Sequence, residues 1–206
     1  MKTNLLLIGL IVAVALSFGA AAWDYFAGDL VLALAVQDIR FSQWHSVMEV
    51  VSSIVKALPM AIGAAIVFCW LVWKRKRPEY LTVGTALICL GLNPLLKLLI
   101  ERPRPTEDLV LVLGNYSGLS FPSGHAFTSM LMFGLLFYLA PLIVKWQRAI
   151  YLTRTACLAM IILTGISRVY LGAHWPSDVL GGFLFGGIVL TLLISFHQRH
   201  LRTALT

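Results

Sequence analysis

The sequence predicts an all-α membrane protein: a six-helix transmembrane bundle with an interfacial helical segment between its first two spans. Of the 206 residues, 59% are hydrophobic and only 12% are charged, which is far outside the usual range of soluble domains. Six apolar stretches are long enough, or nearly so, to cross a bilayer, where the backbone has to be helical to satisfy its hydrogen bonds. We expect the spans at residues 5–22, 58–73, 80–100, 126–144, 150–166 and 179–196, and one domain over residues 1–206.

The first span has a competing interpretation. It follows Lys2 and ends in small residues at positions 19–22, as a cleavable signal peptide would. Its apolar part is longer than is usual for a signal peptide, so we favour a retained helix. Residues 23–57 are too polar to span, but they carry aromatic residues such as Trp23 and Trp44 among polar ones. This pattern is typical of one or two helices lying at the headgroup level.

The basic residues predict the orientation. Cytoplasmic loops of membrane proteins collect Lys and Arg, and here the loops after the second and fourth spans and the C-terminal tail are basic. Both termini are therefore predicted to be cytoplasmic, with the alternate loops on the periplasmic or extracellular face. This distribution also explains the net charge of +7. The charge therefore gives no reason to expect a nucleic acid, which we exclude as a partner. The basic residues concerned are Lys74, Arg75, Lys76, Arg77, Lys145, Arg148, Arg154, Arg199 and Arg202.

Three stretches on the predicted outer side carry polar residues that topology does not require. The first holds Lys97, Arg102 and Arg104, at the outer end of the third span. Cations are disfavoured on this side, so we expect an anion to compensate them. Arg104 lies between two prolines, and the residue before a proline is pushed out of the helical conformation. Arg104 is therefore expected on a semi-rigid loop.

The second stretch, residues 121–125, directly precedes the fourth span. Ser123 is a good N-cap, and Gly124 allows a ligand to come close to the backbone. A helix start with free N–H groups suits a phosphate, and His125 lies in the same first turn. Taken alone, a capped helix with an interfacial histidine explains this stretch equally well.

The third stretch contains Arg168, His174 and Asp178. Pro176 fits the first turn of the sixth span, which places Asp178 four residues after His174 on the same side. A carboxylate that accepts one ring N–H fixes the tautomer of a histidine and leaves its other nitrogen as a base or nucleophile. Together the three stretches predict an outer-face pocket suited to phosphoryl transfer, in which three cations neutralise the phosphoryl oxygens. No metal or other cofactor is expected.

In these three stretches the sequence resembles the type 2 phosphatidic acid phosphatase family, whose pattern is Lys-x6-Arg-Pro, then Pro-Ser-Gly-His, then Ser-Arg-x5-His-x3-Asp. Every position of the pattern is present between Lys97 and Asp178. The resemblance implies that His174 attacks phosphorus, that Asp178 orients it and that His125 protonates the leaving group. It further implies that the phosphoryl oxygens are held by Lys97, Arg104, Ser123, Gly124 and Arg168. Arg102 and Glu101 lie outside the matched pattern and receive no catalytic role.

The resemblance implies a metal-independent membrane phosphatase acting on a lipid phosphate. The compact chain with short loops favours undecaprenyl pyrophosphate. Phosphatidylglycerophosphate or phosphatidic acid is the alternative, because the phosphate-binding residues would be alike for all of them. A non-hydrolytic lipid-phosphate binder or transporter on the same fold stays open, and it would tolerate loss of His174. Vanadium haloperoxidases share the family fold but are soluble. The six spanning stretches therefore argue against a haloperoxidase. Membrane lipids are the other expected partners, and the oligomeric state is left open.

Overall fold

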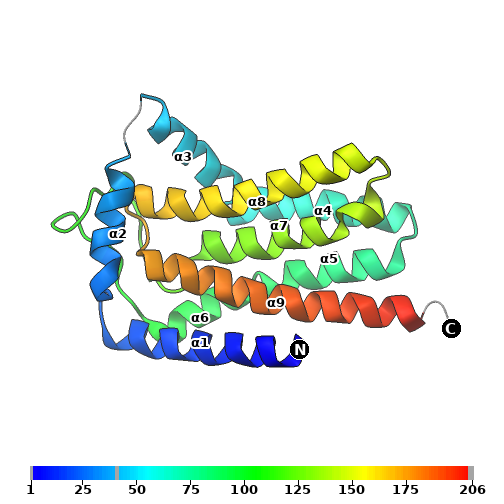
Figure 1. Cartoon of the computed structure of the whole chain (residues 1–206), viewed down its shortest axis with the longest axis horizontal. Coiled ribbons are helices and arrows are strands. Elements are labelled where there is room, and N and C mark those ends of the chain that lie inside the picture. The colour runs from blue at the N-terminus through cyan, green and yellow to red at the C-terminus, as the bar shows by residue number, and fades with distance from the viewer. Residues whose placement is uncertain (1, 40–41, 204–206) are drawn as a thin grey trace.

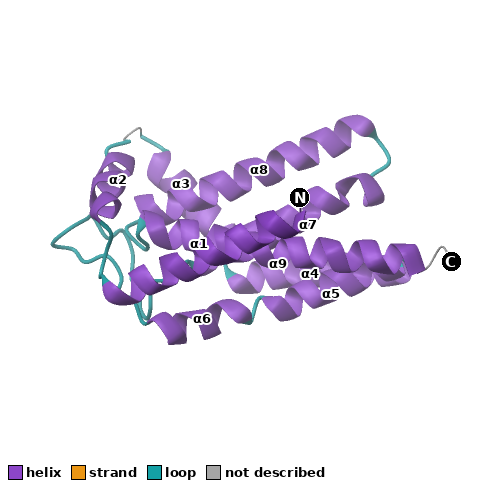
Figure 2. Ribbon diagram, turned by 60° about the horizontal axis from the view of Figure 1, so that its bottom comes forward, coloured by secondary structure: helices purple, strands orange, loops and turns teal. Residues whose placement is uncertain are grey.

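The described residues, 2–39 and 42–203 of a computed structural model, form nine α-helices and no strand (Figures 1 and 2). The helices are α1 (Lys2–Ala22), α2 (Ala27–Gln37), α3 (Trp44–Ile54), α4 (Ala57–Trp73), α5 (Arg77–Cys89), α6 (Leu92–Ile100), α7 (Gly124–Ile143), α8 (Gln147–Tyr170) and α9 (Pro176–Thr203). The all-α prediction is thus confirmed for this part of the chain.

The helices supply five or six candidate membrane spans. Five segments are long and apolar enough by themselves: α1, α7, α8, α9 and the consecutive pair α5–α6, which covers Arg77–Ile100. A sixth span requires α3 and α4 to be counted together, although they are bent by 54° at their junction. The third predicted span is interrupted, since Leu90 and Gly91 separate α5 from α6. The count of six therefore stays a prediction.

The segment predicted to lie at the interface folds into two helices, α2 and α3. Figure 1 shows α2 crossing one end of the bundle at a steep angle to the long helices. Gln37, the last residue of α2, binds the chain at two distant points. Its side-chain amide donates to the carbonyls of Leu111 at 2.7 Å and Tyr170 at 3.0 Å, and its carbonyl accepts from the Leu111 N–H at 3.1 Å. These bonds attach α2 to the bundle end, while its depth in a membrane remains a prediction.

Helix α7 lies at the centre of the bundle, packed mainly against α8 and α9. Small residues allow α9 to come close to it. A Cβ on Gly182 would lie 2.5 Å from the Ser123 carbonyl oxygen, and one on Gly186 would lie 2.8 Å from the Phe127 carbonyl oxygen. The Gly182–Gly186 pair therefore serves packing, as GxxxG pairs do between membrane helices. It fixes the start of α9 against the start of α7.

The outer surface of the bundle is apolar. Large side chains on α1 are widely exposed, including Leu5 at 65%, Ile8 at 56% and Ile11 at 60%. Soluble monomers do not display apolar surface of this extent, whereas lipid chains cover it at no cost. The protein is thus a multi-pass membrane protein.

The two ends of the bundle differ in what they carry. In Figure 1 the left end holds α2 and the long loop of residues 101–123, and the right end holds the α4–α5 and α7–α8 connections and the end of α9. The three polar stretches predicted from sequence all meet at the left end. The basic connections at residues 74–77 and 145–148 lie at the right end.

Candidate active site

Ends of several helices and two connections build a polar site at one end of the bundle. Helix α6 supplies Lys97, the start of α7 supplies residues 123–125, and the last turn of α8 supplies Arg168. His174 lies just before α9, which begins at Pro176 as the sequence predicts. The backbone shapes this connection: Gly172 has a φ of 68°, and a Cβ there would lie 2.1 Å from the Leu111 carbonyl oxygen. Only glycine allows the loop of residues 101–123 to pack this closely against the approach to His174.

His174 is buried and connected to Asp178 through a serine hydroxyl. Its Nδ1 lies 3.6 Å from Asp178 Oδ2, too far for a hydrogen bond. Ser120 Oγ lies between them, 3.1 Å from Nδ1, and donates to Oδ2 at 2.5 Å. The direct bond expected from the sequence is therefore relayed through Ser120, a residue that the sequence analysis did not single out.

This relay determines which ring nitrogen of His174 carries the proton. A serine hydroxyl has one proton, and Ser120 donates it to Asp178. The Ser120 oxygen can then only accept from the ring, so the neutral imidazole carries its proton on Nδ1. Nε2 is left unprotonated, and its electron pair accepts from Arg104 Nη1 at 3.3 Å. The arrangement meets the requirement for a nucleophilic or basic imidazole.

Arg104 is the donor to this nitrogen, and the same Nη1 also donates to the Ala173 carbonyl at 2.6 Å. Its Nε donates to the carbonyls of Ser117 and Gly118, at 3.1 Å each. Burial, followed by the charges of Arg104, Lys97 and Arg168, holds the pKa of His174 well below its usual value of 6.5. Burial also lowers the pKa of Arg104, although nearby Asp178 works in the other direction.

The other two predicted cations also lie near enough to His174 to act on its charge. Lys97 Nζ donates to the carbonyl of Leu119 at 2.5 Å and approaches that of Ser120 at 3.4 Å. Arg168 donates to the hydroxyl of Ser52 and lies over the ring of Tyr116, 5.1 Å from its centre. Arg168 Nε is buried and finds no hydrogen-bond partner among the described residues. Buried cations with donors to spare suit an anion that completes their coordination.

The start of α7 completes the group. The Ser123 N–H donates to the Asp178 carbonyl at 3.0 Å, and its side chain accepts from the Ala126 N–H at 3.5 Å, which confirms the predicted N-cap. Gly124 is the first helical residue, and a Cβ there would lie 3.0 Å from Asn93 Oδ1. His125 Nε2 is buried and has no hydrogen-bond partner in the described part of the chain. His125 lies close enough to His174, Arg104 and Arg168 to interact with them electrostatically.

Two further charged residues enter the site that sequence reasoning left without a role. Arg102, just after α6, donates to Asp178 Oδ1 at 2.6 Å and to Asp29 Oδ2 at 2.9 Å. Asp29 belongs to α2, in the segment assigned to the interface. An anionic partner was expected for Arg102, because cations are disfavoured on this side. Nothing in the sequence connects Asp29 to residues so far along the chain. In the described residues no group of three or more His, Cys, Asp or Glu side chains is arranged to hold a metal.

Long apolar helices and a buried histidine near three cations define an integral membrane protein with a polar, cationic site. The chain belongs to the PAP2 superfamily, whose family model matches residues 79–202. It is similar to phosphatidylglycerophosphatase B of Bacillus subtilis, with 34% identity over 152 residues that cover 72% of this chain and 70% of that protein. It is also similar to an undecaprenyl-diphosphatase of Sulfolobus acidocaldarius, with 29% identity over 62% of this chain and 60% of the relative.

Solved structures agree. A crystal structure of a transmembrane PAP2-type phosphatidylglycerolphosphate phosphatase from Bacillus subtilis superposes with a TM-score of 0.75 at 28% identity, covering 96% of each chain. Aquifex aeolicus LpxE, at 20% identity and a TM-score of 0.63, shares the fold over 84% of this chain and 98% of its own. The resemblance drawn from the motifs is confirmed. The protein is an enzyme, a phosphoric ester hydrolase of the PAP2 membrane lipid phosphatases.

Proposed function

We propose that the protein hydrolyses the phosphate ester of a membrane lipid through a phosphohistidine formed on His174. The observation that carries this proposal is the hydrogen bonding of the His174 ring: the Ser120–Asp178 relay at Nδ1 favours a proton there, and unprotonated Nε2 accepts from Arg104, a cation that would bind the phosphoryl oxygens. A nucleophile needs an available electron pair close to the group that binds the phosphoryl oxygens. His174 supplies the electron pair and Arg104 is the neighbouring cation. His174 itself is only 3% exposed.

The reaction proceeds in two steps. His174 Nε2 attacks phosphorus while His125, protonated when the phosphate is bound, gives its proton to the leaving lipid oxygen. The imidazolium formed on His174 is stabilised by Asp178 through Ser120. Water then attacks the phosphohistidine, neutral His125 accepts a proton from it, and inorganic phosphate leaves with His174 restored. Charge on the phosphoryl oxygens is neutralised by the cations Lys97, Arg104 and Arg168 and by donors at Ser123 and Gly124.

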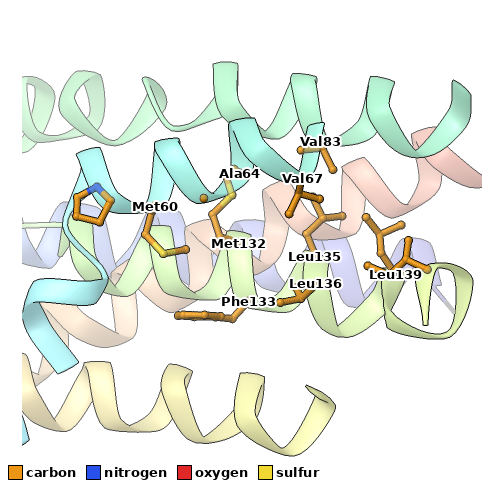
Figure 3. Close-up of a pocket in the computed structure, with 12 residues that line it drawn as sticks. Met60, Ala64, Val67, Val83, Met132, Phe133, Leu135, Leu136 and Leu139 are labelled. Atoms are coloured by element: carbon orange, nitrogen blue, oxygen red, sulfur yellow. The ribbon is translucent and has the colours of Figure 1, made fainter. Parts of the chain in front are cut away.

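An apolar groove supports a lipid as the substrate. It encloses about 260 Å³ between α4, α5 and α7 and is lined by apolar side chains and glycine, with Met60 on α4 and Met132 on α7 facing it (Figure 3). His125 lies at the start of α7, two turns before Met132, so the groove and the polar site share this helix and lie about 10 Å apart along it. We place one hydrocarbon chain of the substrate there.

Among lipids, phosphatidylglycerophosphate is our first candidate. The Bacillus subtilis relatives that cover most of this chain are named for it, both as a sequence and as a solved structure. Undecaprenyl pyrophosphate, which the short loops favoured, is the second candidate, because the similar Sulfolobus acidocaldarius protein is named an undecaprenyl-diphosphatase. The relatives' names also favour hydrolysis over simple binding or transport.

The test is phosphate release by the purified protein in detergent from phosphatidylglycerophosphate, undecaprenyl pyrophosphate and phosphatidic acid, with wild type and His174→Ala side by side. We expect the highest kcat/KM with phosphatidylglycerophosphate and no release by His174→Ala. A phosphoenzyme trapped by acid quenching should form in the wild type and be lost in the variant. Release that survives in His174→Ala would contradict the covalent mechanism, and a preference for undecaprenyl pyrophosphate would reverse the order of candidates.

A further inference from the structure

Arg102 occupies an unusual position for a residue outside the motifs. Its side chain is fully buried and forms ion pairs with Asp29 and Asp178. It donates to Asp178 Oδ1, Asp29 Oδ2, the Ser177 hydroxyl at 2.7 Å and the Asp24 carbonyl at 3.1 Å. One cation thus lies between two buried carboxylates, one from the site and one from α2.

Arg102 controls both groups that orient His174. Its side chain takes one oxygen of the Asp178 carboxylate, leaving Oδ2 for Ser120 and for the Trp175 N–H, which donates at 2.9 Å. Its own carbonyl accepts from the Ser120 N–H at 2.8 Å. A single residue therefore fixes the carboxylate by its side chain and the serine by its backbone, and these two together set the tautomer of His174.

Asp29 in turn holds Arg102 and the start of α9. Its Oδ2 accepts from Arg102, from the Ser177 hydroxyl at 2.6 Å and from the Phe26 N–H at 2.9 Å, and its Oδ1 accepts from the Ser177 N–H at 2.8 Å. Because its bonds to Arg102 and Ser177 are buried and no longer than 2.9 Å, Asp29 leaves Arg102 little freedom to turn away from Asp178. The helix predicted to lie at the interface thereby reaches the reacting centre through two charged side chains.

We propose that Arg102, held by Asp29, is a positioning residue that aligns Asp178 and Ser120 and so keeps Nε2 of His174 unprotonated and able to react. This inference rests on the proposed function and extends it from the motif residues to α2. Arg102 does not touch the phosphate in this arrangement, since its donors are directed to carboxylates, Ser177 and a carbonyl. Its contribution reaches the substrate only through His174.

The test compares kcat/KM as a function of pH for wild type, Arg102→Gln and Asp29→Asn on phosphatidylglycerophosphate. Removing a cation makes the His174–Ser120–Asp178 unit easier to protonate, so the acid limb should move to higher pH in Arg102→Gln. Removing an anion should leave that limb in place or move it to lower pH in Asp29→Asn. The charged groups that also act on this unit are Lys97, Arg104, His125 and Arg168, and all are kept.

We expect kcat to fall about 100-fold in Arg102→Gln, as a small misplacement of a reacting group can cause. Arg102→Lys restores the charge but not the forked geometry that joins two carboxylates. Its acid limb should therefore return towards that of the wild type while kcat stays low. A structural role alone would not separate these two effects.

Two controls distinguish positioning from loss of folding. Gln37→Leu also removes buried hydrogen bonds of α2 but changes no charge, so it matches the structural damage when thermal unfolding of the variants is compared. Arg148→Gln, at an exposed arginine near the start of α8, controls for the substitution itself. We expect neither to move the acid limb.

The positioning role would be overturned if the acid limb of kcat/KM did not move in Arg102→Gln. It would also be overturned if Arg102→Gln and Gln37→Leu had the same thermal stability and the same kcat. In either case the wild type would still be active. Loss of the proposed function looks different, because the wild type itself would then release no phosphate from any of the three lipids. That result would overturn both proposals together.

Discussion

At the scale of single residues, the low pKa of His174 has a measurable consequence. Burial and three neighbouring cations favour its neutral form, so the nucleophile stays available as pH falls below 6.5. The sign for folding is the opposite: a group whose pKa is depressed in the folded protein withdraws stability as pH falls from its unfolded value towards its folded one.

Replacing Arg104 by glutamine tests this. The variant removes the cation next to Nε2, so the pKa of His174 should rise, and the acid limb of kcat/KM should move to higher pH than in the wild type. A profile from about pH 5 to about pH 8 covers the range in which histidine titrates. The ionisation of the substrate phosphate is common to both proteins and cancels in the comparison. Identical acid limbs would show that Arg104 does not set the charge state of His174.

The serine relay makes a second prediction at this scale. Ser120→Ala leaves His174 Nδ1 and Asp178 Oδ2 3.6 Å apart with no hydroxyl between them. We expect kcat to fall about 100-fold, because the ring loses the group that fixes its tautomer and orientation. Ser129→Ala is the matched control: Ser129 is equally buried, but its hydroxyl binds only the Ala126 carbonyl within α7. Equal activity of the two variants would mean that Asp178 orients His174 without Ser120.

At the scale of helices, the groove between α4, α5 and α7 connects substrate class to packing. Gly63 lines the groove, and a Cβ there would meet nothing within 4 Å. Gly63→Leu should therefore fill the groove without straining the helices. We expect kcat/KM to fall about tenfold for a long-chain lipid phosphate, because losing burial of even two methylenes costs about 1.4 kcal/mol or more.

A short-chain analogue of the same headgroup should be hydrolysed by Gly63→Leu as by the wild type, since it has no chain to place in the groove. Gly187→Leu provides the control, because Gly187 on α9 also has open space around its Cβ position but lies outside the groove. If Gly63→Leu treated long and short chains alike, the hydrocarbon chain would have to lie elsewhere on the bundle.

At the scale of the whole molecule, the sequence was informative wherever a physical constraint is local. Bilayer thickness sets the length of a span and lipid forces it to be helical, so the apolar stretches could be located. Ser123 and Pro176 correctly predicted helix starts, because capping and proline preferences act within a single turn. The break at Gly91 escaped prediction, since an apolar helix tolerates a glycine without showing in its hydropathy whether it is interrupted.

Long-range polar contacts could not be predicted in the same way. Arg102 and Ser120 come from the loop of residues 101–123 and bond to Asp178, and Asp29 of α2 reaches it only through Arg102. No periodicity relates these positions. The i to i+4 spacing of His174 and Asp178 correctly placed them on one side. It could not reveal that the remaining gap is bridged by a serine, because that depends on how the loop of residues 101–123 packs against α9.

The placement of charge over the whole molecule predicts how it lies in the membrane. The exposed basic loops gather at the bundle end opposite the site (Figure 1), and such loops are retained in the cytoplasm. The cations at the site end do not oppose this orientation: Arg102 is neutralised by two carboxylates, and Lys97 and Arg168 are engaged in the site. We therefore expect the site to open on the periplasmic or extracellular face.

Labelling of single cysteines in intact cells measures this orientation. With Cys69, Cys89 and Cys157 replaced by alanine, Glu107→Cys in the exposed part of the site loop should react with a membrane-impermeant maleimide. Lys145→Cys, exposed between α7 and α8, should react only after the membrane is permeabilised. The reverse pattern would place the site in the cytoplasm, where the substrate phosphate would have to be presented by the inner leaflet. An outward site instead requires that each lipid phosphate reach the outer leaflet before hydrolysis, so activity in cells would depend on lipid translocation as well as on His174.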